Sequence, residues 1–354
     1  MSIPFSKFTV DNGAITDLRE LLHDTLFNDP DIELVVSSET GVTNGKKLGR
    51  IHSMGDVGKN RSGCKPTYEK PVITGTEKEW DLGPWQIPLE ICYEDLENTL
   101  AKHGMNSGTD IGNLIDTPYW TEVLMPTLEK AIVEMFWRII WFGDKDAKNI
   151  SDSGIITDGV NVELLTMCDG LFKQLKAISS TNPGQFTKIA ANEETTYAAQ
   201  KAAIRVPGVA INIFDEMLSD CDSRIFDDEK AAIYTTNSLF KALRNDVKKV
   251  QNLQLEVEQI ASGIKLSEYD GHPLIVLDVW DRLIKKFEND GTKLNAPYRA
   301  LISTPNNLFA GTSDKKRVAD LSLTFDDKDR MNYIFAQSNI GALVGEDALT
   351  HLAM

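Results

Sequence analysis

The stretch TLEKAIVEMFWRIIWFGD, residues 127–144, decides how the rest of the chain is arranged around it. Its apolar side chains recur at spacings of three and four, which predicts a helix, and further apolar side chains cover much of the remaining circumference. Such a helix must be covered on more than one side, so we expect it inside a domain. Gly143 ends the helix as a C-cap. Thr117 and Pro118 form a helix-start signal upstream, so we predict a long helix over 117–142 that Pro126 kinks or restarts.

Upstream of this helix, an acidic segment is followed by a basic one. Residues 1–45 carry eight acidic and two basic side chains, whereas residues 46–70 carry seven basic and two acidic ones. The basic stretch is rich in Gly, Ser and Asn and nearly lacks large apolar residues, so it cannot bury a core of its own. Residues 68–91 contain strand-like runs punctuated by Gly and Pro, which predict a returning strand. We therefore expect an N-terminal arm and then a long hairpin that projects from the body.

Downstream of the helix the pattern mixes helices and strands. We predict a helix over 159–177, a short strand at 186–190 and a helix over 195–218 that Pro207 interrupts. After residue 226 the two types alternate: strands are expected at 231–235, 274–279, 299–303 and 308–311, helices at 237–249 and 281–289, and final strands at 318–325 and 333–344. The fold class is therefore α+β, with two packed modules and one projecting hairpin.

The composition excludes several classes of protein. The 354 residues carry a formal net charge of −16, so the chain as a whole is repelled by the phosphate backbone of nucleic acids. The four cysteines form no Cys-x-x-Cys pair and the five histidines have no metal-ligand spacing, so we expect neither a metal nor a cofactor. The N-terminus lacks the basic and apolar regions of a signal peptide, and no apolar stretch is long enough to span a bilayer. We expect a soluble protein without a membrane partner.

No familiar catalytic motif occurs in the sequence. Residues 41–47 resemble a phosphate loop only superficially, because the spacing of the glycines and the residue after the lysine are both wrong. We therefore expect that the protein is not an enzyme, although catalytic groups can meet in space from distant positions. The acidic run at 215–229 lacks the order of a calcium-binding loop and is more typical of a solvated edge or of a surface between subunits.

Opposite charges on one chain favour head-to-tail assembly of copies. The basic stretch at 46–70 has Tyr68 as its one aromatic residue, so it lacks the stacking platform of single-strand nucleic-acid binders. We predict instead that the loop contacts an adjacent copy. The residues expected at this contact are Lys59, Arg61, Lys65, Trp80 and Trp85 on the loop, and Asp220, Asp222, Asp227 and Asp228 on the acidic surface that receives it.

The order of elements and three local strings carry a resemblance to a known family. The strings are NEETTYAAQ at 192–200, FDEMLSDCD at 214–222 and YRALISTPNN at 298–307. They resemble major capsid proteins of tailed bacteriophages, in particular those of phages and prophages of Bacteroidetes-type hosts. That family has the Hong Kong 97-type fold, which encapsulin nanocompartments share. The resemblance covers nearly the whole chain and depends on the architecture more than on any single motif.

The resemblance implies a division of the chain. The N-terminal arm would span 1–45, the extended loop 46–92, the peripheral domain 93–226 with the spine helix at 117–142, the axial domain 227–314, and a return to the peripheral domain 315–354. The strand at 318–325 is then expected to pair with the earlier peripheral strand near 186–190. Many relatives carry a scaffolding segment before the arm, and since this sequence begins with the arm, we expect no removal of such a segment.

The implied function is a major capsid protein that assembles as hexamers and pentamers into an icosahedral shell enclosing double-stranded phage DNA. The implied partners are further copies, a portal protein, and scaffolding or decoration proteins, while the DNA is enclosed without sequence-specific binding. The implied location is the virion capsid, assembled in the cytoplasm of the bacterial host. Three alternatives remain from the sequence: an encapsulin-like compartment, a tail or sheath component, and a soluble α+β enzyme with an unrecognised site.

Overall fold

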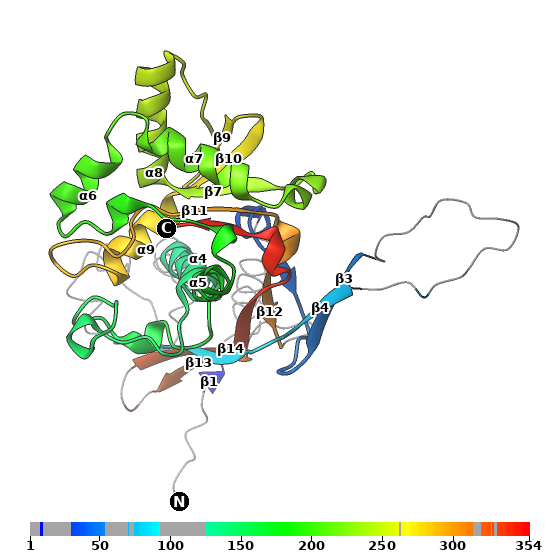
Figure 1. The fold of residues 1–354 in the computed structure, drawn as a ribbon. Coiled ribbons are helices and arrows are strands. Elements are labelled where there is room, and N and C mark those ends of the chain that lie inside the picture. Colours follow the sequence, from blue (N-terminus) through cyan, green and yellow to red (C-terminus); the bar gives the residue numbers. More distant parts are fainter. Residues whose placement is uncertain are drawn as a thin grey trace, which may run out of the picture.

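The computed structural model describes residues 8–9, 30–53, 70, 74–92, 125–261, 263–313, 320–326, 328 and 331–354. Two β-sheets lie on opposite sides of a central helical layer (Figure 1). A second group of helices covers the outer face of one sheet. The body therefore has four layers, and this mixed architecture confirms the predicted α+β class.

The first sheet is built around the long strand β14 (Met331–Val344). β14 pairs antiparallel with β5 (Gly83–Cys92), with β13 (Asp320–Asp326) and with β12 (Leu308–Thr312). The sheet is completed by β1 (Phe8–Thr9), next to β13, and β2 (Ser37–Glu39), parallel to β12. In β5, Pro84 and Pro88 are both exposed, and β14 is the one partner of β5 within the described ranges.

The second sheet has seven strands in the order β6-β15-β11-β7-β10-β9-β8. Side chains of its central strands alternate between two cores: on β10, Leu274 and Val276 face one core, whereas Ile275 and Leu277 face the other. Because both faces are covered, these strands are mostly apolar and are buried along nearly their whole length instead of alternating with exposed polar residues. The strands are β6 (Phe186–Thr187), β7 (Ala232–Thr236), β8 (Glu258–Ala261), β9 (Ile264–Tyr269), β10 (His272–Leu277), β11 (Ala300–Ser303) and β15 (His351–Ala353).

The helices pack against the two hydrophobic cores. Between the sheets lie α4 (Met125–Phe142), α5 (Leu171–Thr181) and α9 (Asp278–Phe287); the outer face of the second sheet carries α6 (Tyr197–Ile204), α7 (Val209–Asp220) and α8 (Asn237–Asp246). α8 continues into the π-helical η10 (Val247–Gln251). Short elements are α2 (Pro30–Glu33), η5 (Ile150–Asp152), η6 (Val162–Leu164), η7 (Pro183–Gln185), η8 (Ala190–Asn192), η9 (Ser223–Asp227), η11 (Pro305–Asn307) and η12 (Asp347–Leu349).

The central helix α4 is buried between the two sheets, as its sequence predicts. Phe136 and Ile139 are fully buried, and Trp141 contacts the ring of Phe172 on α5 and that of Trp280 on α9, with centroids 5.2 and 4.6 Å apart. Aromatic side chains from three helices thus form one cluster between the two sheets. The part of the predicted helix before residue 125 lies outside the described residues.

The predicted helix at 159–177 is wrong in its first half. Its backbone is used for tertiary contacts instead: the carbonyl of Leu164 accepts from Arg138 Nε at 3.1 Å, and that of Leu165 accepts from the amide of Asp144 at 2.9 Å. Asn161 caps only the short turn η6. The helix α5 therefore begins at Leu171. The predicted break at Pro207 is confirmed, since α6 and α7 end and begin on either side of it.

The predicted module boundary at 227–314 also needs correction. The strands β6 and β15, at 186–187 and 351–353, belong to the second sheet, whereas β12, at 308–312, belongs to the first. The strand near 320 pairs with β14 and β1 and not with the strand near 186. The strand near 186 pairs instead with β15, which lies between β6 and β11 with all three of its side chains buried.

Candidate interface around the hairpin

The predicted hairpin is present in its described arms. β3 (Lys47–Ser53) pairs antiparallel with β4 (Thr74–Glu79), and the two form a separate ribbon beside the body (Figure 1). Its basic and acidic side chains are paired within the chain: Lys47 Nζ lies 3.0 Å from Glu77, and Lys78 Nζ lies 2.7 Å from Asp347 on η12. Lys59, Arg61 and Lys65 lie outside the described residues.

The hairpin joins the body at Trp80. This indole packs into a small cluster with Val42, Leu82, Phe309 and Leu343. Its backbone accepts from the amide of Gly45 and donates to the carbonyl of Lys46, both at 3.0 Å. Gly311 makes room for the ring, because a Cβ at that position would lie 2.6 Å from the indole. The base of the hairpin is therefore seated in the first sheet.

The burial of Trp80 and Trp85 within the subunit corrects the expectation that they contact another subunit. Both side chains are 2% exposed within the chain itself. Trp85 faces the central helices, where its ring meets Phe136 edge-on with centroids 5.7 Å apart. The alternation of β5 turns this residue inward, so its large apolar surface stabilises the subunit core.

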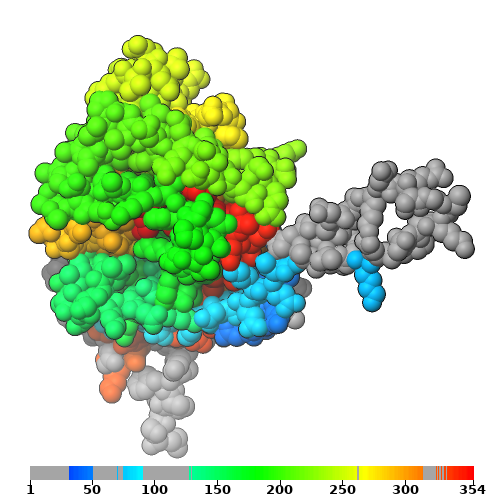
Figure 2. Space-filling view, viewed as in Figure 1, coloured from blue at the N-terminus to red at the C-terminus, as the bar shows by residue number. Residues whose placement is uncertain are grey.

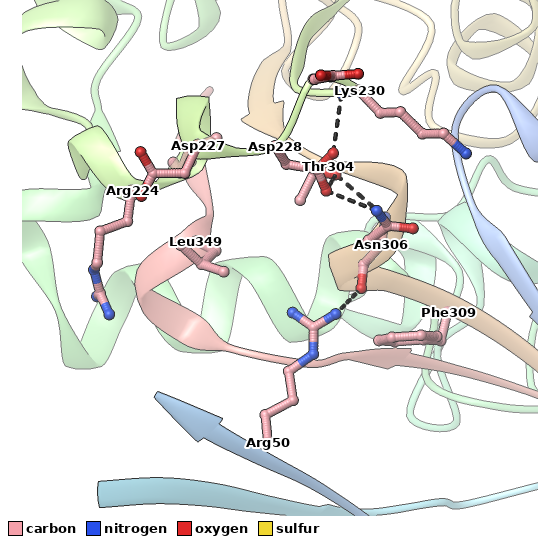
Figure 3. A pocket seen from close by; sticks show the side chains of 11 residues that line it. Arg50, Arg224, Asp227, Asp228, Lys230, Thr304, Asn306, Phe309 and Leu349 are labelled. Carbon is pink, nitrogen blue, oxygen red and sulfur yellow. Dashed lines mark hydrogen bonds between the residues drawn. The ribbon is translucent and has the colours of Figure 1, made fainter. Parts of the chain in front are cut away.

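Arg50 ties the hairpin to a turn of the body (Figure 3). Its guanidinium donates to the carbonyl oxygen of Asn306, and to Asn307 Oδ1 at 3.2 Å. It also lies over the ring of Phe309, 5.5 Å from the centroid. An arginine presents several donors in a fixed plane, so one side chain can hold two acceptors and an aromatic face together.

On the other side of this turn lies Asp228. Its Oδ2 accepts from Thr304 Oγ1 and from Asn306 Nδ2, both at 2.7 Å (Figure 3). Partial burial raises the pKa of Asp228, but the hydrogen bonds from Thr304, the Lys230 amide and Asn306 outweigh it, so the pKa is lowered overall. Asp228 is therefore charged at neutral pH. A cavity of about 810 Å³ lies between this acidic segment and Arg50.

Of the comparisons with known proteins, the one with solved structures identifies the architecture. No family model matches the sequence, and no curated protein matches it. Among solved structures, one from Mycobacterium phage Ogopogo matches with a TM-score of 0.51 and 10% identity, covering 91% of this chain and 90% of that one. The chain has the Hong Kong 97-type capsid fold.

Two further solved structures align at lower scores. The procapsid of satellite phage P4 with its size determination protein gives a TM-score of 0.49 at 12% identity, covering 96% of this chain and 98% of that one. The encapsulin SrpI of Synechococcus elongatus gives 0.47 at 11%, covering 93% and 88%.

Within the capsid fold, the predicted acidic residues fall into two kinds. Asp222 and Asp228 are bonded inside the chain: Asp222 pairs with Arg224 at 2.7 Å, and the hydrogen bond from Arg224 lowers the pKa of this carboxyl. Asp220, at the end of α7, and Asp227 are exposed. The structure thus brings Asp222, Asp227 and Asp228 together on one short segment, while two of the four carboxylates already have partners.

The sequence reasoning missed the residues of the turn itself. Thr304, Asn306 and Asn307 occur in the string at 298–307, and the order Thr-Pro-Asn-Asn is a signal for a capped turn. Thr304 does cap the turn, since its hydroxyl accepts from the Asn306 amide at 3.3 Å. Arg50 is one of the seven basic residues at 46–70, but its partners lie more than 250 residues away along the chain, beyond the reach of a sequence pattern.

A second exposed feature lies at the far end of the second sheet (Figure 2, yellow-green and yellow at the top). Val250, Leu253, Val257 and Ile260 are between 38 and 60% exposed. Exposed basic side chains precede this apolar tip and exposed acidic ones lie within it: Lys248, Lys249, Glu256 and Glu258. A monomer rarely leaves such a group of apolar residues in water, so the tip is a candidate contact surface.

The described residues offer no site for a metal ion: no group of three or more His, Cys, Asp or Glu side chains among them is arranged to hold one. Over the same residues, no helix is long and apolar enough to cross a membrane.

Proposed function

We propose that this chain is the major capsid protein of a tailed bacteriophage and that its copies form hexamers and pentamers of an icosahedral shell. The observation that carries the proposal is the capsid fold, matched over nine-tenths of both chains by the structure from a Mycobacterium phage. The exposed apolar tip supports it, because an isolated subunit leaves this surface in water. The hairpin supports it because, among the described strands, β3 and β4 pair with each other alone and form a ribbon outside the two large sheets. The task is structural and needs no catalytic residue.

The apolar tip is the surface we assign to contacts within a ring of subunits. Basic residues before the tip and acidic residues within it allow one copy to meet the next head to tail, and such contacts close into a ring when the rotation permits. Burying Leu253 and its three apolar neighbours would supply the driving force. The same contact can serve five or six copies with a small change of angle.

The basic loop is the surface we assign to contacts with an adjacent subunit. Lys59, Arg61 and Lys65 would approach the acidic segment of a neighbour, where Asp220 and Asp227 are exposed. Asp222 and Asp228 would hold this segment in shape through their bonds within the chain. Each exposed ion pair is worth only about 0.2–1 kcal/mol, but a shell repeats the contact for every subunit.

The shell would enclose double-stranded DNA without recognising its sequence. A chain with a net charge of −16 is repelled by phosphates, and weak adhesion allows the genome to enter and leave. In this proposal the shell is assembled in the host cytoplasm, a portal protein occupies one vertex, and scaffolding or decoration proteins are further partners.

Electron microscopy of the expressed full-length chain tests the proposal. We expect closed shells, or rings of five and six subunits, at low salt and high protein concentration. A chain that remains monomeric by light scattering under these conditions, with or without a scaffolding partner, would contradict the proposal. Particles isolated from the source culture should contain nuclease-protected DNA; particles with a protein cargo and no DNA would indicate an encapsulin-like compartment.

A further inference from the structure

The turn Thr304–Asn307, which we call the junction turn, holds three distant segments together. Thr304 is 3% exposed and Asn307 is fully buried. The three segments are the hairpin, the acidic segment around Asp228, and η12 with Glu346 before it. Buried polar groups rarely lack a partner, so a displacement of one segment requires Thr304 and Asn307 to rearrange their other bonds. Asn306 between them is exposed, and it joins two of the segments through its side chain and its carbonyl.

The hairpin is attached to this junction through both of its strands. On β3, Arg50 bonds the carbonyl of Asn306 and the side chain of Asn307. On β4, Lys78 pairs with Asp347 of η12. η12 is held in turn by Asn307, whose Nδ2 donates to the carbonyl of Glu346 at 2.9 Å and whose Oδ1 accepts the Glu346 amide at 2.7 Å.

The acidic segment is attached to the same turn from the opposite side. Asp228 accepts from Thr304 and Asn306, and Arg224 reaches Glu346 with an N–O distance of 3.2 Å. Asn306 is thus shared: its side chain serves the acidic segment and its carbonyl serves the hairpin. Neither Asp228 nor Arg224 has a bond to a hairpin residue among the described residues.

We propose that the junction turn couples the two halves of the subunit contact, so that a second copy of this chain docking on the acidic segment fixes the position of the hairpin on the same subunit. This inference rests on the proposed function, because it assigns the partner of the acidic segment. A basic side chain of the docking copy beside Asp227 shifts or holds the acidic segment. Asp228 passes this shift to the junction turn through its hydrogen bond from Asn306, and the Asn306 carbonyl passes it to Arg50. A subunit that has received a neighbour then presents a pre-positioned hairpin, which lowers the ordering cost of the next contact.

Hydrogen exchange of the unassembled full-length chain tests the coupling. Asp228→Ala should increase amide exchange in β3 and β4 about five- to tenfold, although Asp228 does not touch the hairpin, since it removes hydrogen bonds to a charged group. Asp227→Ala is the matched control, because it removes the same charge one residue away and should leave the hairpin unchanged. Arg50→Ala, which cuts the link directly, should raise exchange at least as much.

A second variant distinguishes loss of the coupling from unfolding of the subunit. Asn306→Ala deletes the side chain that holds Asp228 but keeps the carbonyl that holds Arg50, and should also raise exchange in the hairpin strands while the melting temperature stays close to that of the native chain. If Arg50→Ala raises the exchange and neither Asp228→Ala nor Asn306→Ala does, the coupling is refuted. That result leaves the shell proposal intact, because assembly is measured separately by electron microscopy.

Discussion

Replacing Glu288 by Gln should destabilise the subunit strongly, because it leaves a buried arginine without its counter-charge. Arg299 is completely buried and pairs with Glu288, whose side chain is 7% exposed. The guanidinium also lies over the rings of Phe172 and Phe142, 4.7 and 5.2 Å from their centroids. The pair therefore lies against the aromatic cluster that joins α4, α5 and α9.

The magnitude follows from this burial. Removing one partner of a buried ion pair costs about 3–5 kcal/mol, since the remaining charge has lost both water and its partner. The matched control is Glu193→Gln, which breaks the pair of Lys188 and Glu193, with an N–O distance of 2.6 Å and both side chains more than 60% exposed. That change should cost less than about 1 kcal/mol.

Urea unfolding of the unassembled chain, followed by tryptophan fluorescence, measures both costs. Trp141 and Trp280 lie in the aromatic cluster and report on its loss. The double change Arg299→Met with Glu288→Leu should recover most of the stability, because apolar side chains of similar size need no counter-charge. If Glu288→Gln costs no more than Glu193→Gln, the buried pair does not stabilise the subunit as its burial implies.

Other predictions concern the hairpin, the tip and the acid response. Trp80→Ala should lower the unfolding free energy by about 3–5 kcal/mol in urea titrations, whereas a value near zero would mean that the indole is not seated in the sheet. Reversing Lys59, Arg61 and Lys65 to Glu should leave the melting temperature of the unassembled chain unchanged and reduce particle yield severely; normal yield would show that the loop does not attract a neighbour by charge. Leu253→Glu should leave the subunit folded, by circular dichroism, and prevent rings in electron micrographs; intact rings would remove the tip from the contact. Burial lowers the pKa of His351, so the unfolded chain binds the proton more readily and stability should fall as the pH drops below about 6.5; His351→Gln should lose this part of the pH dependence in unfolding measured at pH 7.5 and 5.5, and an unchanged slope would argue against it.

The sequence predicts those features that depend on neighbouring residues. The helix ending at Phe142, the break at Pro207 and the alternation after residue 226 all follow from periodicity and turn residues, and each is present. The membership of β15 in the second sheet does not follow, because strand pairing depends on which distant edge has room for its side chains. The burial of Trp80 does not follow from the sequence either, because the space that Gly311 leaves for its ring exists only once the two segments meet.

The charges of the candidate interface could be predicted from the sequence, but its hydrogen bonds could not. The acidic run and the basic loop are evident from counting residues, whereas the bonds of Asp228 to Thr304 and Asn306 join positions more than 70 apart. Arg50 uses a backbone carbonyl as its partner, and every residue has one, so no pattern of side chains could identify it.

The two prolines of β5 have a consequence for the life of the subunit before assembly. A proline has no N–H to donate, so Pro84 and Pro88 are compatible with pairing to β14 only if their nitrogens face the other side of β5, where no strand pairs within the described ranges. An incoming strand would therefore find two of the donors on this side missing. Such gaps protect an exposed strand from edge-to-edge aggregation. The shell that we propose requires many free subunits at high concentration, and this edge would not make them precipitate.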